Sequence, residues 1–203
     1  MHYSSKIFLL FFFSICFITE SQATTVYRKY QYFNVYGKTA EALDKSLRKD
    51  GPYVEKTGHR HPGATIISFA PNITVWQDGK YCRVATAKVD VYAKIQLPKW
   101  KHANKTKDKV LSTVWDTLSR DIKRHEEAHV VIARTTANNI ERAVRALPVQ
   151  KNCDIMISDI NKVVEKKLKA HDAEQAHFDN VESINFENRI KRLLIYKLQQ
   201  KHK

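Results

Sequence analysis

The sequence predicts an α+β fold, in which an N-terminal antiparallel sheet precedes a C-terminal helical part. From Ala85 to Leu97 the odd-numbered residues are apolar, which is the period of a strand with one buried face. From Leu111 to Leu147 apolar residues instead recur at steps of three, four or their sums, which is typical of an amphipathic helix. Because the strand patterns come first and the helical patterns follow, an α+β arrangement is expected.

The sheet is expected to form from segments rich in β-branched and aromatic residues. These strands are predicted at residues 26–36, 64–69, 73–76 and 85–97. Asp78-Gly79 is a strong hairpin signal, and Pro98 is predicted to end the last strand. One edge strand is expected beside the functional site, where an extended peptide could pair with its main chain.

Helical segments are predicted at residues 39–50, 106–147, 153–177 and 186–203. The third is expected to bury a stripe formed by Ile157, Ile160, Val164 and Leu168. The last is basic and amphipathic, so packing on the domain and adhesion to an anionic membrane are its alternatives.

Residues 1–23 predict an export signal. A weakly positive start precedes an apolar run at residues 7–18, and Ser21-Gln22-Ala23 is a small-x-small cleavage site. The protein is therefore expected in the periplasm or outside the cell. Residues 24–185 are expected to form one domain, followed by the basic helix at 186–203.

The formal net charge of +14 suits a protein that meets anionic surfaces, such as membranes or cell-wall polymers. No RNP-like, zinc-finger or Gly-rich phosphate-binding pattern accompanies the lysines, so nucleic-acid binding is not expected. Once the leader is removed, only Cys82 and Cys153 remain. In an oxidising compartment these two cysteines are expected to form a disulfide.

The most informative stretch is His125-Glu126-Glu127-Ala128-His129, which lies within the predicted long helix. His125 and His129 are one helical turn apart, so both imidazoles point the same way and could bind one zinc ion. Glu126, about 100° round the axis, could reach a water beside that ion, whereas Glu127 faces away. The alternative is a pair of core histidines that are satisfied by hydrogen bonds.

A catalytic zinc ion takes three protein ligands and a water, so one further ligand must come from elsewhere in the chain. The candidates follow the motif helix and lie near the end of the next helix: His171, Glu174, His177, Asp179 and Glu182. Their spacing does not choose between them.

The order of these motifs resembles the bacterial family DUF922, described as predicted secreted zinc-dependent proteases. The resemblance rests on the exported leader, a cysteine-containing strand that ends in Leu97-Pro98-x-Trp100, the H-E-x-x-H helix, a later cysteine and an aromatic-Asp pair. It covers nearly the whole mature chain up to about Asn185. It implies a zincin-like metalloprotease domain over residues 24–185, with zinc bound by His125 and His129, Glu126 as the catalytic residue, and a disulfide between Cys82 and Cys153.

The family's distal segment reads Tyr-Asp-x-x-Thr-x-His-Gly, and the matching stretch here is Phe178 to Asn185. The aspartate is kept as Asp179, while the Thr, His and Gly positions hold Glu182, Ile184 and Asn185. Asp179 is therefore the first choice for the remaining zinc ligand, ahead of Glu182 and His177.

The expected function is hydrolysis of peptide bonds in a peptide or protein substrate, with Glu126 as general base for a zinc-activated water. His59, Arg60 and His61 are candidates for stabilising the oxyanion. The alternatives are a zinc-binding relative without catalysis, or a basic module that adheres to anionic surfaces.

Overall fold

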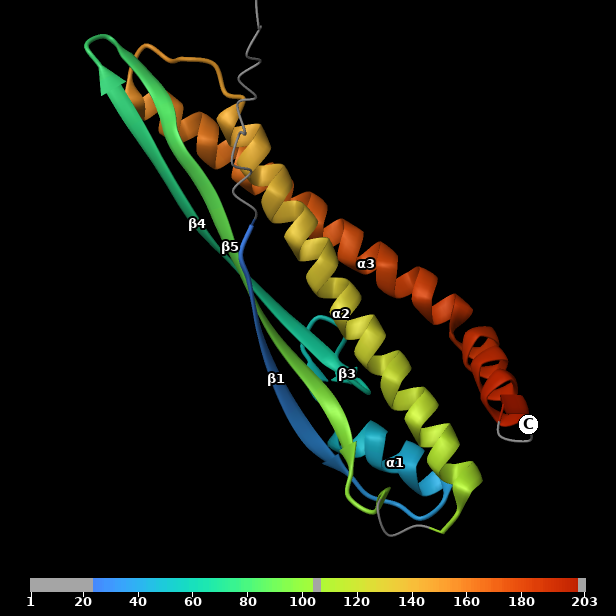
Figure 1. The fold of residues 1–203 in the computed structure, drawn as a ribbon. Coiled ribbons are helices and arrows are strands. Elements are labelled where there is room, and N and C mark those ends of the chain that lie inside the picture. The colour runs from blue at the N-terminus through green and yellow to red at the C-terminus, as the bar shows by residue number, and fades with distance from the viewer. Residues whose placement is uncertain (1–23, 104–106, 201–203) are drawn as a thin grey trace, which may run out of the picture.

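The computed structural model describes residues 24–103 and 107–200. The expected export signal, residues 1–23, lies outside the described residues. The α+β fold class is confirmed, because the main sheet is followed by two long helices, α2 (Lys109–Arg145) and α3 (Cys153–Gln200). Figure 1 shows an elongated molecule in which α2 and α3 lie on one side of a long, twisted sheet.

The sheet contains β1 (Val26–Val35), β4 (Ala64–Asp78) and β5 (Tyr81–Trp100), in the order β1-β5-β4. Strands β4 and β5 form the expected antiparallel hairpin, but β1 pairs with β5 in parallel. The sheet is thus mixed, and the expectation of an antiparallel sheet was wrong. The chain leaves β1 through α1 (Ala40–Asp50) and a small hairpin of β2 (Tyr53–Val54) and β3 (His59–Arg60), then enters β4 on the opposite edge of β5.

Pro71 and Pro98 lie within strands and do not interrupt them. Strand β4 runs through Pro71, where two separate strands were expected, because β4 is an edge strand and tolerates a missing N–H on its free side. Strand β5 likewise continues past Pro98 to Trp100. Pairing with β4 has already ended at Gln96, so at Pro98 only the β1 side carries a partner strand.

Helix α2 is unbroken, and the Asp108 side chain caps it by accepting hydrogen bonds from the backbone N–H groups of Val110 and Leu111. Helix α3 was expected to end near residue 177 but continues to Gln200, so residues 186–200 are its last turns. No glycine or proline occurs after Pro148, and nothing in the local sequence stops the helix. Its first buried position is Met156, whereas Ile157, expected inward, is exposed.

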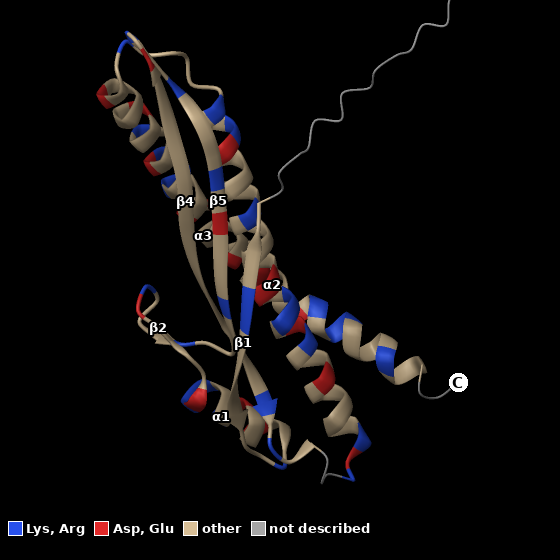
Figure 2. Cartoon of the chain, turned by 60° about the vertical axis from the view of Figure 1, so that its left-hand side comes forward, with Lys and Arg blue, Asp and Glu red and all other residues tan. Residues whose placement is uncertain are grey.

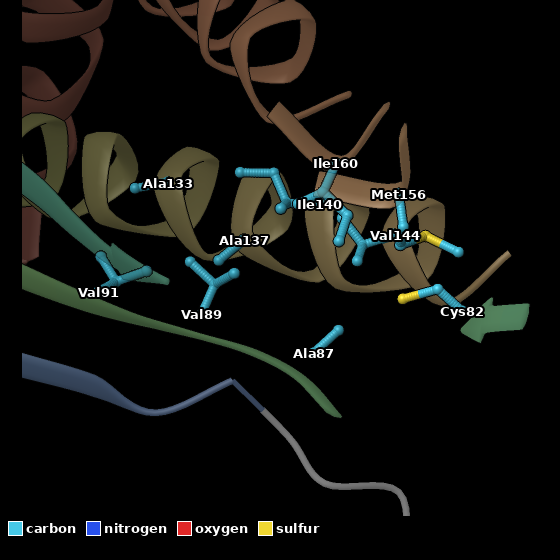
Figure 3. Close-up of a cluster of buried hydrophobic side chains, with 10 residues drawn as sticks. All are labelled: Cys82, Ala87, Val89, Val91, Ala133, Ala137, Ile140, Val144, Met156 and Ile160. Carbon is cyan, nitrogen blue, oxygen red and sulfur yellow. The ribbon is translucent and has the colours of Figure 1, made fainter. Parts of the chain in front are cut away.

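The largest apolar cluster joins β5, α2 and the first turns of α3, as Figure 3 shows. Its buried members are Cys82, Ala87, Val89, Val91, Ala133, Ala137, Ile140, Val144, Met156 and Ile160. The expected disulfide between Cys82 and Cys153 is present at this end and ties β5 to the start of α3. A second cluster lies between β5 and the middle of α2. It includes Ala93, Ile95, Leu97, Ile122 and Val130.

The last turns of α3 carry several Lys and Arg residues, as Figure 2 shows. Their apolar residues Ile190, Leu194 and Leu198 are half-buried, and Lys197 donates a hydrogen bond to the Thr117 hydroxyl of α2 at 3.1 Å. These contacts correspond to packing on the domain, the first of the two alternatives for this segment. None of the helices in the described residues combines the length and hydropathy that crossing a bilayer requires.

Candidate metal centre

The two motif histidines lie at the middle of α2 and face α3. Their spacing of four residues places the His125 and His129 rings on one side of the helix, with ring centroids 4.8 Å apart. The two Nε2 atoms are 3.1 Å apart. Both side chains are partly shielded from solvent, with 26% exposure for His125 and 13% for His129, so the pair remains accessible.

Asp179 of α3 completes a compact triangle of donor atoms. Its Oδ1 lies 3.3 Å from Nε2 of His125 and 3.1 Å from Nε2 of His129. Ligand atoms about 2.0–2.1 Å from a tetrahedral zinc ion would stand about 3.3 Å from one another. Among the described residues, this is the group of histidine and carboxylate side chains that could hold a metal ion. The donor atoms therefore fit zinc in both type and separation.

Electrostatic interactions favour the ionised carboxylate of Asp179, which is the form that can bind a metal ion. Burial raises the pKa of Asp179, but hydrogen bonds and charge interactions with both histidines outweigh it and hold that pKa well below the ordinary value. The pKa of His129 is shifted in the opposite direction. Burial lowers its pKa, but the Asp179 carboxylate and the Gln175 carbonyl together raise it. In the metal-free protein the cluster thus behaves as a carboxylate paired with imidazoles.

Two further side chains of α3 hold the rings. Phe178 stacks on His125 at 5.0 Å between ring centroids and meets His129 edge-on at 5.1 Å. The Gln175 carbonyl accepts a short hydrogen bond from Nδ1 of His129, and its amide donates to the His129 backbone carbonyl at 3.2 Å. This leaves Nε2 of His129 directed towards Asp179 and His125.

Glu126 lies between α2 and the sheet and is only 5% exposed. The Thr65 hydroxyl of β4 lies 2.8 Å from its Oε2, within hydrogen-bonding distance. Gly63 leaves room for this side chain, because a Cβ there would stand 2.7 Å from Glu126 Oε1. Burial raises the pKa of Glu126, although the Thr65 hydrogen bond and the nearby His125 and His129 oppose the rise. The buried Glu126 carboxyl group therefore holds its proton more readily than an exposed glutamate does.

Glu127, the other acidic residue of the motif, points away from the histidines, as expected. It accepts a hydrogen bond from the Tyr30 hydroxyl of β1 at 2.6 Å and lies 3.8 Å from the Lys123 ammonium. Neither carboxylate oxygen of Glu127 belongs to the candidate metal group. The side chains of the two adjacent glutamates therefore contact different strands, Glu126 β4 and Glu127 β1.

The other candidate ligands lie outside the triangle. Glu182 lies 3.7 Å from Nδ1 of His125, but its carboxylate is paired with Arg124 and, at 3.1 Å, with Arg189. His177 and Glu174 are exposed, and His171 is buried against Phe69 of β4. The two arginines also bind Asp121 of α2, so this charge network fastens α3 to α2 beside the site.

The β2–β3 hairpin brings the oxyanion candidates near the site without placing any of them in it. The rings of His59 and His61 stack at 4.4 Å, and Arg60 donates to the Gly51 carbonyl. Burial and the neighbouring His59 lower the pKa of His61, while the Asp179 charge raises it. His61 thus lies within electrostatic range of the metal group.

Sequence reasoning did not identify Thr65 or Gln175, and it named Phe178 only as part of the matching family segment, without a role at the site. One signal was present for the α3 residues, because His171, Gln175, Phe178 and Glu182 continue the inward stripe of Met156 and Ile160 at steps of three and four. No local pattern marks Thr65, since its role depends on the approach of β4 to α2.

Comparison with protein families matches residues 30–186 to the family described as "Bacterial protein of unknown function (DUF922)". No curated protein and no solved structure shows a significant match.

Proposed function

We propose that this chain, which belongs to the DUF922 family, is an exported zinc-dependent hydrolase of peptide bonds with Glu126 as its general base. One observation carries the proposal: donor atoms of His125, His129 and Asp179 converge, and the helix that carries the two histidines also carries a buried glutamate between them. Neutral imidazoles and a carboxylate are ligands that zinc takes in hydrolytic enzymes, with one position left for water.

His125, His129 and Asp179 would hold the ion. When bound there, zinc would polarise the scissile carbonyl and make a neighbouring water more acidic. Glu182 is kept from becoming a further ligand by Arg124 and Arg189, so the group of three leaves the site open rather than closed.

Glu126 takes the proton of the attacking water and passes it to the leaving amine. The Thr65 hydroxyl bonds Oε2 and fixes the carboxylate, while Oε1 faces Gly63 and is the oxygen left for water. Because the pKa of Glu126 is raised, the group can both accept and return a proton. Activity then requires ionised Glu126 and falls on acidification.

The substrate is an extended peptide. Strand β4 is an edge strand of the sheet, and its residue Thr65 already contacts Glu126. A peptide that pairs with the free edge of β4 would bring its main chain past the metal group. The Cys82–Cys153 disulfide supports action in an oxidising compartment, which agrees with the export signal expected at residues 1–23.

The test uses residues 24–203, expressed with the disulfide formed. We expect about one zinc ion per chain and cleavage within a peptide library. Glu126→Gln should lower kcat/KM by about 100-fold or more while zinc stays bound. The matched control is Glu127→Gln, which changes the adjacent carboxylate that faces β1 and should retain both zinc and activity.

Full activity in a zinc-loaded Glu126→Gln protein would refute the role of this residue. Absence of bound metal in the folded protein would refute the whole proposal. One zinc per chain without cleavage of any peptide would instead identify a metal-binding protein without catalysis.

A further inference from the structure

Glu141 is a buried carboxylate of α2 that does not belong to the candidate metal group. It is 3% exposed, and its Oε1 accepts a hydrogen bond from the Val89 backbone N–H at 2.8 Å. Arg145 lies 3.6 Å from Oε2, but its guanidinium group donates to the Ala87 carbonyl instead. Among the described residues, no cationic side chain comes within hydrogen-bonding distance of this carboxylate. A buried charge is costly unless it is paired, so Glu141 has room for a closer cation.

The residue that faces Glu141 is Thr24, which would become the first residue after cleavage of the expected export signal. The start of a chain is usually poorly ordered unless contacts tie it down, yet Thr24 is only 5% exposed. Its hydroxyl lies 2.6 Å from Asn138 Oδ1 and 3.2 Å from Glu141 Oε1. A hydroxyl has one hydrogen to donate, so two acceptors compete for it. The surroundings of Thr24 thus favour a further donor.

The backbone pairing of β1 with β5 also ends at this point. Just before β1 begins, the Thr25 carbonyl accepts a hydrogen bond from the Val91 N–H at 2.9 Å. Alternate N–H groups of a strand point to the same edge, so the Val89 N–H also points to the β1 side of β5. The Glu141 side chain accepts this hydrogen bond. The chain before Thr24 is therefore not required to satisfy this buried N–H group.

Cleavage would create a cation beside these acceptors. Hydrolysis of the Ala23–Thr24 peptide bond consumes one water and leaves a carboxylate on Ala23 and an amino group on Thr24. With an ordinary pKa of about 8, that amino group is mostly protonated at neutral pH. Three bonds separate the nitrogen of Thr24 from its hydroxyl oxygen, so the two atoms are at most about 4 Å apart. The ammonium group would thus stand next to the hydroxyl that already contacts Asn138 and Glu141.

We propose that Glu141 and Asn138 form a binding site for the protein's own amino terminus, the Thr24 ammonium group that removal of the export signal creates. The proposal depends on cleavage after Ala23 and is independent of metal binding. An ammonium group brings three donors and a positive charge, whereas the amide of the uncleaved chain brings one neutral N–H. Hydrogen bonds between charged groups are the stronger ones, so maturation fastens the start of β1 to α2.

The test compares two forms of residues 24–203 with the disulfide formed. One has a free amino group on Thr24, released from a fusion that leaves no added residue, and the other is acetylated at that group alone. The Tm of the free-amine form should be higher by about 3 °C or more, because acetylation removes the charge. Mass spectrometry of the exported full-length chain should find a mature protein that begins at Thr24.

Glu141→Gln is the variant that isolates the carboxylate. Its amide oxygen can still accept from the Val89 N–H, but the charge is gone. The free-amine and acetylated forms of this variant should therefore unfold within about 1 °C of each other. The matched control is Glu165→Gln, an exposed carboxylate on α3, which should keep the full difference. Because each difference is measured within one variant, a general loss of stability does not imitate the result.

Equal Tm values for the two wild-type forms would overturn the proposal, and this comparison does not depend on the folding of any variant. A difference that persists in Glu141→Gln would also overturn it, as would a mature protein that begins at another residue. None of these outcomes involves zinc or peptide cleavage, so failure of this proposal is distinct from failure of the proposed function.

Discussion

One face of α2 meets α3 in two halves that differ in chemistry. Towards the N-terminal end of this face stand His125 and His129, which contact Asp179, Gln175 and Phe178. Further along, at the same four-residue step, the face carries Ala133 and Ala137, which are fully buried. There α2 packs against β5 and the first turns of α3, next to the disulfide.

Helical spacing alone therefore does not decide what a buried face does. The apolar half gains stability from area removed from water, which needs close packing but no particular partner atom. The polar half is held by directional hydrogen bonds and ion pairs between named atoms, whose net contribution to stability is small. Stability should reside mainly in the apolar half and chemistry in the polar half. Variants in the apolar half should accordingly lose more free energy of unfolding than variants in the polar half.

The largest loss is expected from removal of the disulfide. The double variant Cys82→Ser/Cys153→Ser opens a link between residues 71 positions apart. The free energy of unfolding should fall by roughly 4 kcal/mol, because the unfolded chain regains the entropy that the link removed. Urea denaturation would measure this, and reduced wild-type protein should give the same result. An unchanged midpoint would show that the link adds nothing to stability.

The next loss is expected from Ile140→Ala in the apolar cluster. Ile140 is 1% exposed, so truncation leaves a cavity and should cost about 3 kcal/mol of unfolding free energy. The control is Ile157→Ala on α3, where the side chain is 47% exposed and the cost should be below about 0.5 kcal/mol. Equal costs at the two positions would contradict the observed packing of α3.

A smaller loss is expected from Asp121→Asn, which weakens the ion pairs that fasten α3 beside the site. Two arginines contact this 3% exposed carboxylate, and its neutralisation should cost about 2 kcal/mol at neutral pH. The control is the exposed Asp116→Asn on the same helix.

The pH dependence of this loss has a defined sign. Burial raises the pKa of Asp121, but Arg189 and Arg124 outweigh it and lower that pKa below its ordinary value of 3.8. The ionised carboxylate therefore stabilises the fold above pH 3.8, and this contribution is lost as pH falls further. The wild type and Asp121→Asn should converge in stability at strongly acidic pH. A constant difference between them would exclude the ion pairs as the cause.

The smallest loss of stability is expected from His129→Ala in the metal-free protein, at about 1 kcal/mol or less. Its zinc affinity should nevertheless fall by more than about 100-fold, since even residues that only orient a ligand contribute 10- to 100-fold. The control, exposed His177→Ala on α3, should change neither quantity. Retention of stoichiometric zinc by His129→Ala, measured by metal analysis, would remove His129 from the site.

Features that lie within one helix or strand, or that join two segments in only one possible way, could be predicted from the amino-acid sequence alone. The rotation per residue of a helix is fixed by its backbone, so the H-E-x-x-H spacing is sufficient to place His125 and His129 together. The two-residue period of β5 and the hairpin signal at Asp78-Gly79 fixed the β4–β5 pair in the same way. Outside the expected export signal the sequence has two cysteines, which left one possible intramolecular disulfide between them.

Contacts between elements that lie far apart in the chain depend instead on tertiary packing. The family resemblance already favoured Asp179 over Glu182 and His177. Whether its carboxylate meets the two histidines depends on how α3 is rotated against α2, because one residue of shift turns a helix by about 100°. The parallel pairing of β1 and the contact between Thr65 and Glu126 depend on where the α1 and β2–β3 segment returns the chain. Such relations follow from packing over many residues, whereas periodicity acts only within an element.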